Sequence, residues 1–237
     1  MEKELYVIIT AGGAGLRMGG NIAKQFLLLD GKPILLRTIE LFRKWREDVN
    51  IILVLPSGYK DYWKRYCLEN NLWFRHTIVS GGITRFHSVK NALKYVPGNA
   101  LVAVHDGVRP FVPAEMLERL MDGRFYEDPG KKVCGVIPVM PAIESMREKV
   151  TDAQGITKDT FTVDRDKYLF VQTPQVFDSG ILKSCYQTAY SPGFTDDASV
   201  AESCGYKIKT VPGSRFNIKI TTPEDLKMAE IIRGMRL

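Results

Sequence analysis

The chain has 237 residues, of which 45% are hydrophobic and 25% charged, a composition that excludes disordered, collagen-like and coiled-coil proteins. Its net charge of +6 is spread along the sequence, which suits anionic small molecules and argues against nucleic-acid binding. The longest apolar runs have the length of a strand, so we expect no membrane-spanning helix and no membrane partner. The first residues lack the pattern of a secretion signal, which predicts a cytoplasmic protein.

The cysteines give no sign of a structural metal site or of a disulfide framework. The four cysteines, at positions 67, 134, 185 and 204, form no C-x-x-C pair and no cluster with histidine. We therefore expect them to be buried, reduced thiols.

Strand and helix patterns alternate through the first half of the chain. Apolar, β-branched runs predict strands at 5–10, 51–55, 76–79 and 100–105. Apolar residues at helical spacing predict a helix that opens near Pro33 and further helices at 59–71, 85–95 and 113–121. This alternation predicts an α/β fold with one doubly wound, mostly parallel sheet of the Rossmann-like kind. Ligands of such sheets bind outside the carboxyl ends of the strands, so the loops after Thr10, Val79 and Val104 should line the site.

The pattern changes after a further strand at 133–139. Residues 140–162 are rich in Thr, Lys, Asp and Glu, contain a turn at 152–155 and show no amphipathic helix. This predicts a β-hairpin arm over roughly 139–165, projecting from a single domain that covers 1–237. The other expected elements are strands at 169–173 and 207–211, helices at 181–190 and 197–203, and a last helix capped by Thr222 and Pro223.

A glycine-rich segment, 11–20, directly follows the first strand. Glycines at this place let backbone amides approach phosphate oxygens. Met18 stands where a dinucleotide-binding motif needs its third glycine, and the segment lacks the Gly-Lys-Ser/Thr of a P-loop. Arg17 and Lys24 add positive charge, although the loop alone also fits a turn with solvated basic residues.

Two further positions carry side chains suited to phosphate chemistry. Asp106 and Arg109 follow the strand expected at 100–105, where a carboxylate can hold Mg²⁺ and a guanidinium can clamp a phosphate. Lys219 lies in an apolar segment before the last helix. Each signal is weak by itself, since a strand-end aspartate often caps a loop and such a lysine often only reaches for solvent.

In this order, the motifs resemble the sugar-phosphate nucleotidyltransferases, and more narrowly the 2-C-methyl-D-erythritol 4-phosphate cytidylyltransferases of the non-mevalonate isoprenoid pathway. The resemblance covers essentially the whole chain and is carried by segments 11–25, 105–110, 162–165, 173–175 and 217–226. It implies transfer of CMP from CTP to 2-C-methyl-D-erythritol 4-phosphate, giving 4-diphosphocytidyl-2-C-methyl-D-erythritol and pyrophosphate. It also implies Mg²⁺ as cofactor and a homodimer in which the arm of one subunit reaches the site of the other.

The resemblance assigns roles to individual residues. The cations expected to stabilise charge on the phosphates are Arg17, Lys24 and Lys219. The residues expected to bind CTP are Ala11, Gly12, Gly13, Ala14, Gly15, Gly82, Ser88, Asp106 and Gly107, with Mg²⁺ on Asp106. The residues expected to hold the polyol phosphate are Arg109, Ser145, Arg165, Thr173, Thr195 and Lys219, with Arg165 acting in the partner's site. The sequence departs from the family pattern at Ile83, where an acidic residue is common, and over 140–145, where Ser145 replaces a threonine.

The implied reaction suits a site without a general base. A phosphate monoester is largely ionised at pH 7 and can attack the α-phosphorus of CTP directly. The obstacle is repulsion between two anions, which positioned cations and Mg²⁺ overcome. Replacing Arg17 or Lys24 by alanine should therefore reduce turnover roughly 10²-fold.

Three alternatives stay open at this point. A D-ribitol-5-phosphate cytidylyltransferase shares the glycine-rich loop and the segment around Lys219, although 162–165 and 195–199 favour the methylerythritol enzyme. A nucleotide-dependent oxidoreductase is weakened by Met18 and by the lack of an acidic residue at the end of the second strand. The third is a basic binding module without catalysis.

Overall fold

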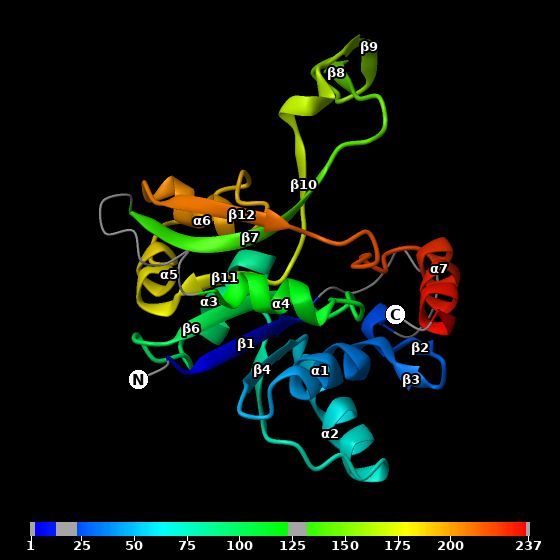
Figure 1. The fold of residues 1–237 in the computed structure, drawn as a ribbon, viewed down its shortest axis with the longest axis vertical. Coiled ribbons are helices and arrows are strands. Elements are labelled where there is room, and N and C mark those ends of the chain that lie inside the picture. The colour runs from blue at the N-terminus through cyan, green and yellow to red at the C-terminus, as the bar shows by residue number, and fades with distance from the viewer. Residues whose placement is uncertain (1–2, 13–22, 123–131, 236–237) are drawn as a thin grey trace.

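The structure is a computed structural model that describes residues 3–12, 23–122 and 132–235 (Figure 1). Its centre is an eight-stranded sheet with the order β10-β7-β11-β6-β1-β4-β5, in which β12 also pairs with β7. The strands are β1 (Leu5–Thr10), β4 (Asn50–Leu55), β5 (His76–Ser80), β6 (Leu101–Asp106), β7 (Val133–Pro141), β10 (Leu169–Val171), β11 (Gln175–Asp178) and β12 (Lys207–Pro212).

The sheet is parallel in its first half and mixed in its second. Strand β1 runs parallel to β4 and β6, and β4 runs parallel to β5. Strand β11 is antiparallel to both β6 and β7, while β12 is parallel to β7. The expected doubly wound, mostly parallel sheet is thereby confirmed.

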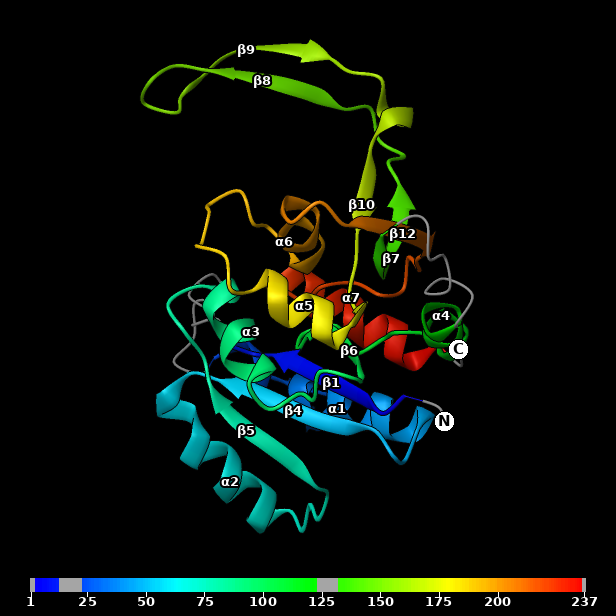
Figure 2. The same cartoon turned by 90° about the vertical axis from the view of Figure 1, so that its left-hand side faces the viewer.

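Helices cover both faces of the sheet (Figure 2). Because side chains alternate along a strand, Val7 and Ile9 of β1 pack in one core cluster and Ile8 in another. The first cluster includes side chains of α1 (Ile34–Trp45), α2 (Lys60–Glu69) and α4 (Ala114–Met121). The second includes side chains of α3 (Arg85–Leu93), α5 (Ser179–Cys185) and α6 (Asp197–Ser203).

Smaller elements frame the end of the sheet where the site lies. The 3₁₀-helix η2 (Lys24–Phe26) is followed by the short pair β2 (Leu28–Leu29) and β3 (Lys32–Pro33). The last helix, α7 (Pro223–Gly234), is capped by Thr222. The Thr222 side chain accepts a hydrogen bond from the Asp225 amide, and the Asp225 side chain accepts one from the Thr222 amide, which completes a capping box. The cap expected from the sequence at Thr222 and Pro223 is confirmed.

Two expected elements differ from those observed. The helix expected at 181–190 is the shorter α5, which Asp178 caps by accepting a hydrogen bond from the Ile181 amide. The helix ends at Cys185 and is followed by Tyr186, a buried residue whose hydroxyl donates a hydrogen bond to Asp197. The strand expected at 169–173 ends at Val171, and the sheet continues in β11 after Pro174, which has no N–H to donate.

The arm is a two-stranded hairpin that stands away from the body in both views (Figures 1 and 2). Strands β8 (Arg147–Thr151) and β9 (Thr157–Thr162) pair antiparallel and expose nearly all of their side chains. Strand β10 pairs with the end of β7 and connects the arm to the sheet.

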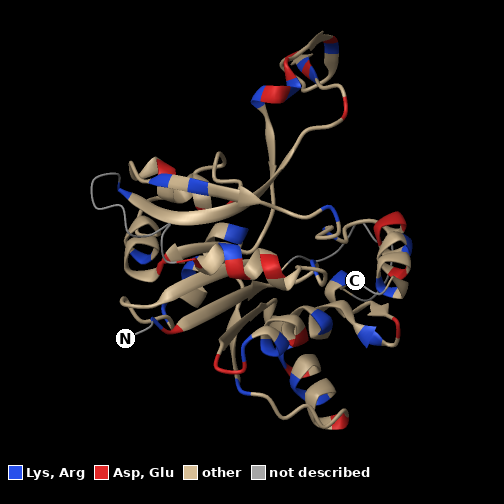
Figure 3. Cartoon of the chain, in the orientation of Figure 1, with Lys and Arg blue, Asp and Glu red and all other residues tan. Residues whose placement is uncertain are grey.

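All four cysteines are free thiols, and Cys134 and Cys185 are buried as expected. The expectation of burial is wrong for Cys204, which is exposed, and Cys67 is only partly buried. Lys and Arg alternate with Asp and Glu over the helices and the arm (Figure 3). Within the described ranges, no helix combines the length and the apolar character needed to span a bilayer.

Candidate active site

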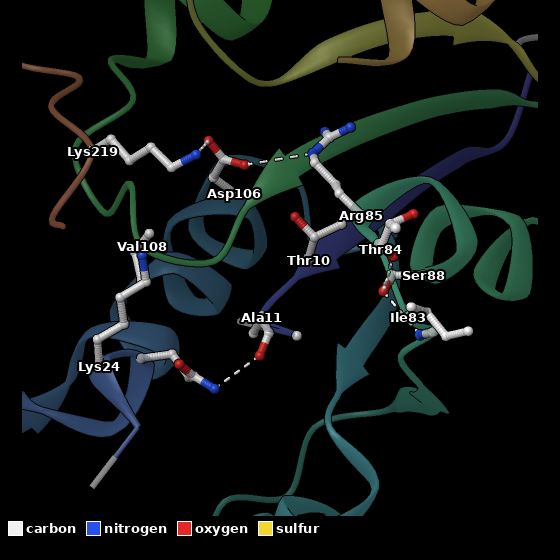
Figure 4. A pocket seen from close by; sticks show the side chains of 13 residues that line it. Thr10, Ala11, Lys24, Ile83, Thr84, Arg85, Ser88, Asp106, Val108 and Lys219 are labelled. Carbon is white, nitrogen blue, oxygen red and sulfur yellow. Dashed lines mark hydrogen bonds and ion pairs between the residues drawn. The ribbon is translucent and has the colours of Figure 1, made fainter. Parts of the chain in front are cut away.

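Two adjoining cavities lie at the carboxyl ends of the parallel strands. The first, drawn in Figure 4, has a volume of about 440 Å³ and the second about 260 Å³. Arg85, Asp106 and Lys219 line both cavities and mark their junction. The first cavity is also lined by Thr10, Ala11, Gly12, Lys24, Gln25, Gly82, Ile83, Thr84, Ser88 and Val108. The second is also lined by Arg109, Val171, Gln172, Thr173, Gln175, Thr195 and Asp196.

Asp106, the last residue of β6, is a buried carboxylate surrounded by cations. Its Oδ2 accepts a hydrogen bond from Nε of Arg109 at 3.0 Å and lies 3.1 Å from Nζ of Lys219. Nε of Arg85 lies 4.0 Å from its Oδ1. Burial alone would raise the pKa of Asp106, but the charges of Lys219, Arg85 and Arg109 outweigh burial and hold the pKa well below its usual range. Asp106 is therefore ionised whenever the protein is folded near neutral pH.

Thr173 and His105 fix the backbone at Asp106. The Thr173 hydroxyl accepts a hydrogen bond from the Asp106 amide at 3.1 Å and lies 3.0 Å from Nδ1 of His105. Nε2 of His105 lies 3.0 Å from the carbonyl oxygen of Arg109. A carbonyl can only accept, so Nε2 carries the proton and the Thr173 hydroxyl donates to Nδ1. Burial lowers the pKa of His105 to about 4, which keeps the imidazole neutral and unsuited to act as a base at pH 7.

The edge of the first cavity near β1 presents backbone groups and a lysine. Gln25, which is buried, donates from Nε2 to the carbonyl oxygen of Ala11 at 2.8 Å and ties η2 to the end of β1. This contact places Lys24 and Gly12 on the cavity wall. The wall therefore combines accessible backbone with positive charge, a combination suited to phosphate.

The opposite edge is the turn between β5 and α3. The Gly82 amide donates to Oγ of Ser88 at 3.0 Å, and the same Oγ donates to the carbonyl oxygen of Thr84. A Cβ at Gly82 would lie 2.4 Å from Cβ of His87, so the turn has no room for a side chain there. Ile83 follows Gly82 in this turn and has 97% of its surface exposed.

The wall of the second cavity is built on the buried amide of Gln175. Oε1 of Gln175 accepts hydrogen bonds from the amides of Asp197 and Ala198, and Nε2 donates to Oδ2 of Asp196 at 2.8 Å. Asp196 caps α6, and Thr195 precedes it on the exposed rim. Strand β11 thereby fixes the start of α6 beside the junction.

Comparison with known proteins identifies the family. The family model described as "IspD: 2-C-methyl-D-erythritol 4-phosphate cytidylyltransferase" matches residues 5–234. The chain belongs to this family. A relative with that enzyme name from Phocaeicola vulgatus is 50% identical over 228 residues, covering 96% of this chain and 98% of the relative. Another, from Azobacteroides pseudotrichonymphae, is 49% identical and covers 97% of this chain and 99% of the relative.

Solved structures agree with this assignment. The 4-diphosphocytidyl-2C-methyl-D-erythritol synthase of Anaerococcus prevotii is 29% identical, with a TM-score of 0.76 over 98% of this chain and 97% of that one. The 2-C-methyl-D-erythritol 4-phosphate cytidylyltransferase of Francisella tularensis is 31% identical, with a TM-score of 0.74 over 97% of this chain and 99% of that one. Membership of this family leaves no support for the oxidoreductase or for the non-catalytic binding module.

Most of the residues singled out in the sequence lie at the two cavities. The expected CTP-binding and catalytic residues that line the first cavity are Ala11, Gly12, Lys24, Gly82, Ser88, Asp106 and Lys219. The expected polyol-phosphate residues that line the second are Arg109, Thr173, Thr195 and Lys219. Gly13, Ala14, Gly15 and Arg17 lie outside the described residues. Gly107 lines neither cavity, and its amide donates to the carbonyl oxygen of Thr10 at 2.9 Å.

Ser145 and Arg165 are not brought to either cavity of their own chain. Both are exposed residues of the arm. Nη1 of Arg165 donates to the carbonyl oxygen of Ile143 within the arm. Any role of these two residues at a site would therefore be played in a second subunit.

Arg85 is the residue of the junction that our sequence analysis missed. It is the first residue of α3, directly after Thr84, whose side chain accepts a hydrogen bond from the His87 amide and caps the helix. The signal was a threonine cap and a basic residue immediately after the Gly81–Gly82 turn. Nothing in that pattern identifies which side of the helix faces the site, because this depends on how α3 packs on the sheet.

Proposed function

We propose that the protein transfers CMP from CTP to 2-C-methyl-D-erythritol 4-phosphate, releasing pyrophosphate. The observation that carries the proposal is the pair of cavities that meet at Arg85, Asp106 and Lys219. Two cations and one carboxylate at the junction suit a reaction in which two anionic substrates are brought together. The location in the cytoplasm, expected from the sequence, is part of the proposal.

The first cavity would take CTP and the second the polyol phosphate. The Gly82 turn and Ser88 would face the cytosine, while Ala11, Gly12 and the glycine-rich segment would approach the triphosphate. In the second cavity, Arg109, Thr173 and Thr195 would hold the methylerythritol phosphate. The Arg109 side chain is already oriented in the free protein, because its Nη1 donates to the carbonyl oxygen of Asn217 at 2.8 Å.

The reaction would be a direct displacement at the α-phosphorus. A phosphate oxygen of the polyol phosphate forms a bond to this phosphorus, and the bond from the phosphorus to the bridging oxygen breaks. Pyrophosphate leaves with the electron pair of that bond, and no proton needs to be removed from the ionised nucleophile. Lys24 and Lys219, with Arg17 of the glycine-rich segment, would stabilise the negative charge that develops.

The side chains at the junction fit a Mg²⁺ ion that would be bound mostly by the phosphates of the substrates. In the described part of the chain, no group of three or more His, Cys, Asp or Glu side chains forms a metal site. Oδ1 of Asp106 accepts no hydrogen bond from the described residues, which leaves one carboxylate oxygen for a cation. Mg²⁺ commonly takes one or two carboxylates together with substrate phosphates. When bound on Asp106, it would neutralise charge on the triphosphate.

The proposal extends to a homodimer joined through the arm. Apolar side chains are exposed along the arm and β10, among them Phe161 at 57%, Leu169 at 51% and Phe170 at 56%. Exposed apolar groups gathered on one projecting element favour burial against another chain. In such a dimer, Ser145 and Arg165 would reach the second cavity of the partner subunit.

Pyrophosphate release tests the proposed reaction. The protein would be mixed with CTP and Mg²⁺, and either 2-C-methyl-D-erythritol 4-phosphate or D-ribitol 5-phosphate would be added. We expect release with the methylerythritol substrate. Release with ribitol phosphate alone would transfer the proposal to that substrate, and release with neither would overturn the activity.

Light scattering during size-exclusion chromatography tests the dimer. We expect twice the mass of the 26.8 kDa chain for the intact protein. Phe170→Ser should shift the mass toward that of one chain, whereas Trp73→Ser, a change at an exposed aromatic far from the arm, should not. A monomeric intact protein would contradict this part of the proposal.

A further inference from the structure

Arg85 lies at the junction of the two cavities and is oriented from behind by a buried carboxylate. Its Nη2 donates to Oδ2 of Asp197 at 2.6 Å, and the side chain of Asp197 is fully buried. Oδ1 of Asp197 accepts a hydrogen bond from the Tyr186 hydroxyl, also at 2.6 Å. Asp197 lines neither cavity. It therefore lies behind the guanidinium, with no exposed side-chain surface toward either cavity.

The remaining donors of Arg85 are available on the cavity side. Nε lies 4.0 Å from Oδ1 of Asp106, which is an ion pair beyond hydrogen-bond distance. A dashed line marks this pair in Figure 4. Among residues 3–12, 23–122 and 132–235, Nη1 has no hydrogen-bond partner. The side chain keeps 28% of its surface exposed. A guanidinium has five N–H donors, so Arg85 can bond Asp197 and a phosphate at the same time.

Burial makes the ion pair with Asp197 a fixed feature of the fold. A carboxylate with no exposed surface is costly unless a cation and hydrogen-bond donors compensate it. Arg85 supplies the cation, while the hydroxyl of Tyr186 and the position of α6 on Gln175 fix the carboxylate. The guanidinium is therefore held at the junction before substrate arrives, as expected of a group that stabilises a transition state.

We infer that Arg85 is a catalytic residue that donates hydrogen bonds to the phosphate oxygens during transfer, and that Asp197 is its positioning residue. The inference rests on the proposed function and adds a cation that our sequence analysis did not assign. Since Arg85 touches both cavities, it meets the charge that develops when the two substrates react. Its loss should lower kcat much more than it weakens CTP binding.

The test compares kcat with CTP affinity in matched double variants. Arg85→Gln combined with Asp197→Asn removes both charges of the buried pair, so that no unpaired carboxylate is left. Arg46→Gln combined with Asp48→Asn removes an ion pair with a separation of 2.9 Å on the surface and is the control. Pyrophosphate release gives kcat, calorimetry with CTP and Mg²⁺ gives the CTP dissociation constant, and thermal unfolding reports the fold.

We expect the Arg85 double variant to lose roughly 10²-fold in kcat while its CTP dissociation constant changes less than about threefold. The control pair should change neither. A folded double variant with kcat within about threefold of the intact protein would overturn the inference, as would an equal loss in kcat and CTP affinity. An inactive intact protein would instead overturn the proposed function, so the two failures are distinguishable.

A second variant decides the inference if the double variant does not fold. Arg85→Lys keeps a positive charge opposite Asp197, but it has one nitrogen where arginine has three. The Asp197 carboxylate would pair with this single nitrogen, so the contact to the phosphate would be lost. A fall in kcat of about tenfold or more with intact CTP binding supports the inference, and a smaller fall overturns it.

Discussion

Nζ of Lys219 lies 3.1 Å from Oδ2 of Asp106 and joins the segment before α7 to the end of β6. The same oxygen accepts a hydrogen bond from Arg109, so one carboxylate orients two cations that face the second cavity. In the free protein, Asp106 thus pairs with both cations and partly neutralises their charge. Anionic substrates and Mg²⁺ would take over this pairing when they bind.

Lys219→Met tests the cation at the junction. The change keeps the length of the side chain and removes its charge, so it should lower turnover roughly 10²-fold. The matched control is Lys64→Met, at a lysine of α2 with 62% of its side chain exposed. Steady-state kinetics with both substrates measure the effect. Equal turnover in the two variants would remove Lys219 from the catalytic residues.

Asp106→Asn tests the proposed Mg²⁺ site. The carboxamide keeps the shape of the side chain but loses the negative charge that attracts a cation. The Mg²⁺ concentration for half-maximal pyrophosphate release should rise about tenfold or more. Asp61→Asn, at an exposed aspartate of α2, serves as the control. An unchanged Mg²⁺ requirement in Asp106→Asn would place the cation elsewhere.

The buried imidazole of His105 should make the protein less stable in mild acid. Its pKa is about 4 in the folded protein, below the value of 6.5 for a free histidine, because burial disfavours the charged form. Between these values the unfolded chain binds a proton that the folded chain does not. The free energy of unfolding should therefore fall as the pH drops from about 6.5 to 4, by about 3 kcal/mol from this residue.

Urea unfolding at several pH values checks this dependence, and His105→Gln is the comparison. The glutamine cannot titrate, so the variant should show a shallower slope between pH 6.5 and 4 even though it is less stable at pH 7. Asp106 does not confound the comparison, since its pKa lies well below the usual range and its contribution is lost only at lower pH. Parallel slopes in the two proteins would refute the assignment to His105.

Gly82→Ala tests the turn proposed to face the cytosine. The added Cβ would lie 2.4 Å from Cβ of His87, so the turn must shift and its amide must leave Ser88. The KM for CTP should rise about tenfold, while the KM for the polyol phosphate changes little. Gly98→Ala is the control because a Cβ there meets no atom within 4 Å. A comparable rise in both KM values would point to general destabilisation of the protein.

Mixing two inactive variants tests the shared site. In the proposed dimer, Lys219→Met damages the body of a site, while Arg165→Gln damages the arm that enters the partner's site. A mixed dimer then has one site with an intact body and an intact arm. After exchange of subunits, the mixture should regain up to about a quarter of the intact activity, because about half of the dimers are mixed and each has one intact site. Mixing without any recovery would show that Arg165 does not act across the dimer.

The sequence alone determined the elements whose signals are local. The apolar run at 5–10, the turn at Gly81–Gly82 and the cap at Thr222 depend on neighbours within a few residues, and the structure contains them as expected. The position of the cavities also followed from the sequence, because parallel strands in alternation with helices bring their carboxyl ends to one edge. The residues of the glycine-rich segment and Asp106 were recognisable because their motifs are continuous in the chain.

Only the tertiary structure decided which distant side chains meet. The pairing of Lys219 with Asp106, the hydrogen bonds of Thr173 to His105 and Asp106, and the link from Asp197 to Arg85 join separate elements. The helix expected at 181–190 ends at Cys185, and the next residue, Tyr186, is buried and bonds Asp197, a contact that no local pattern encodes. Such contacts depend on the order of the strands and on the face by which each helix packs, and these are set by burial of the whole core rather than by any single segment.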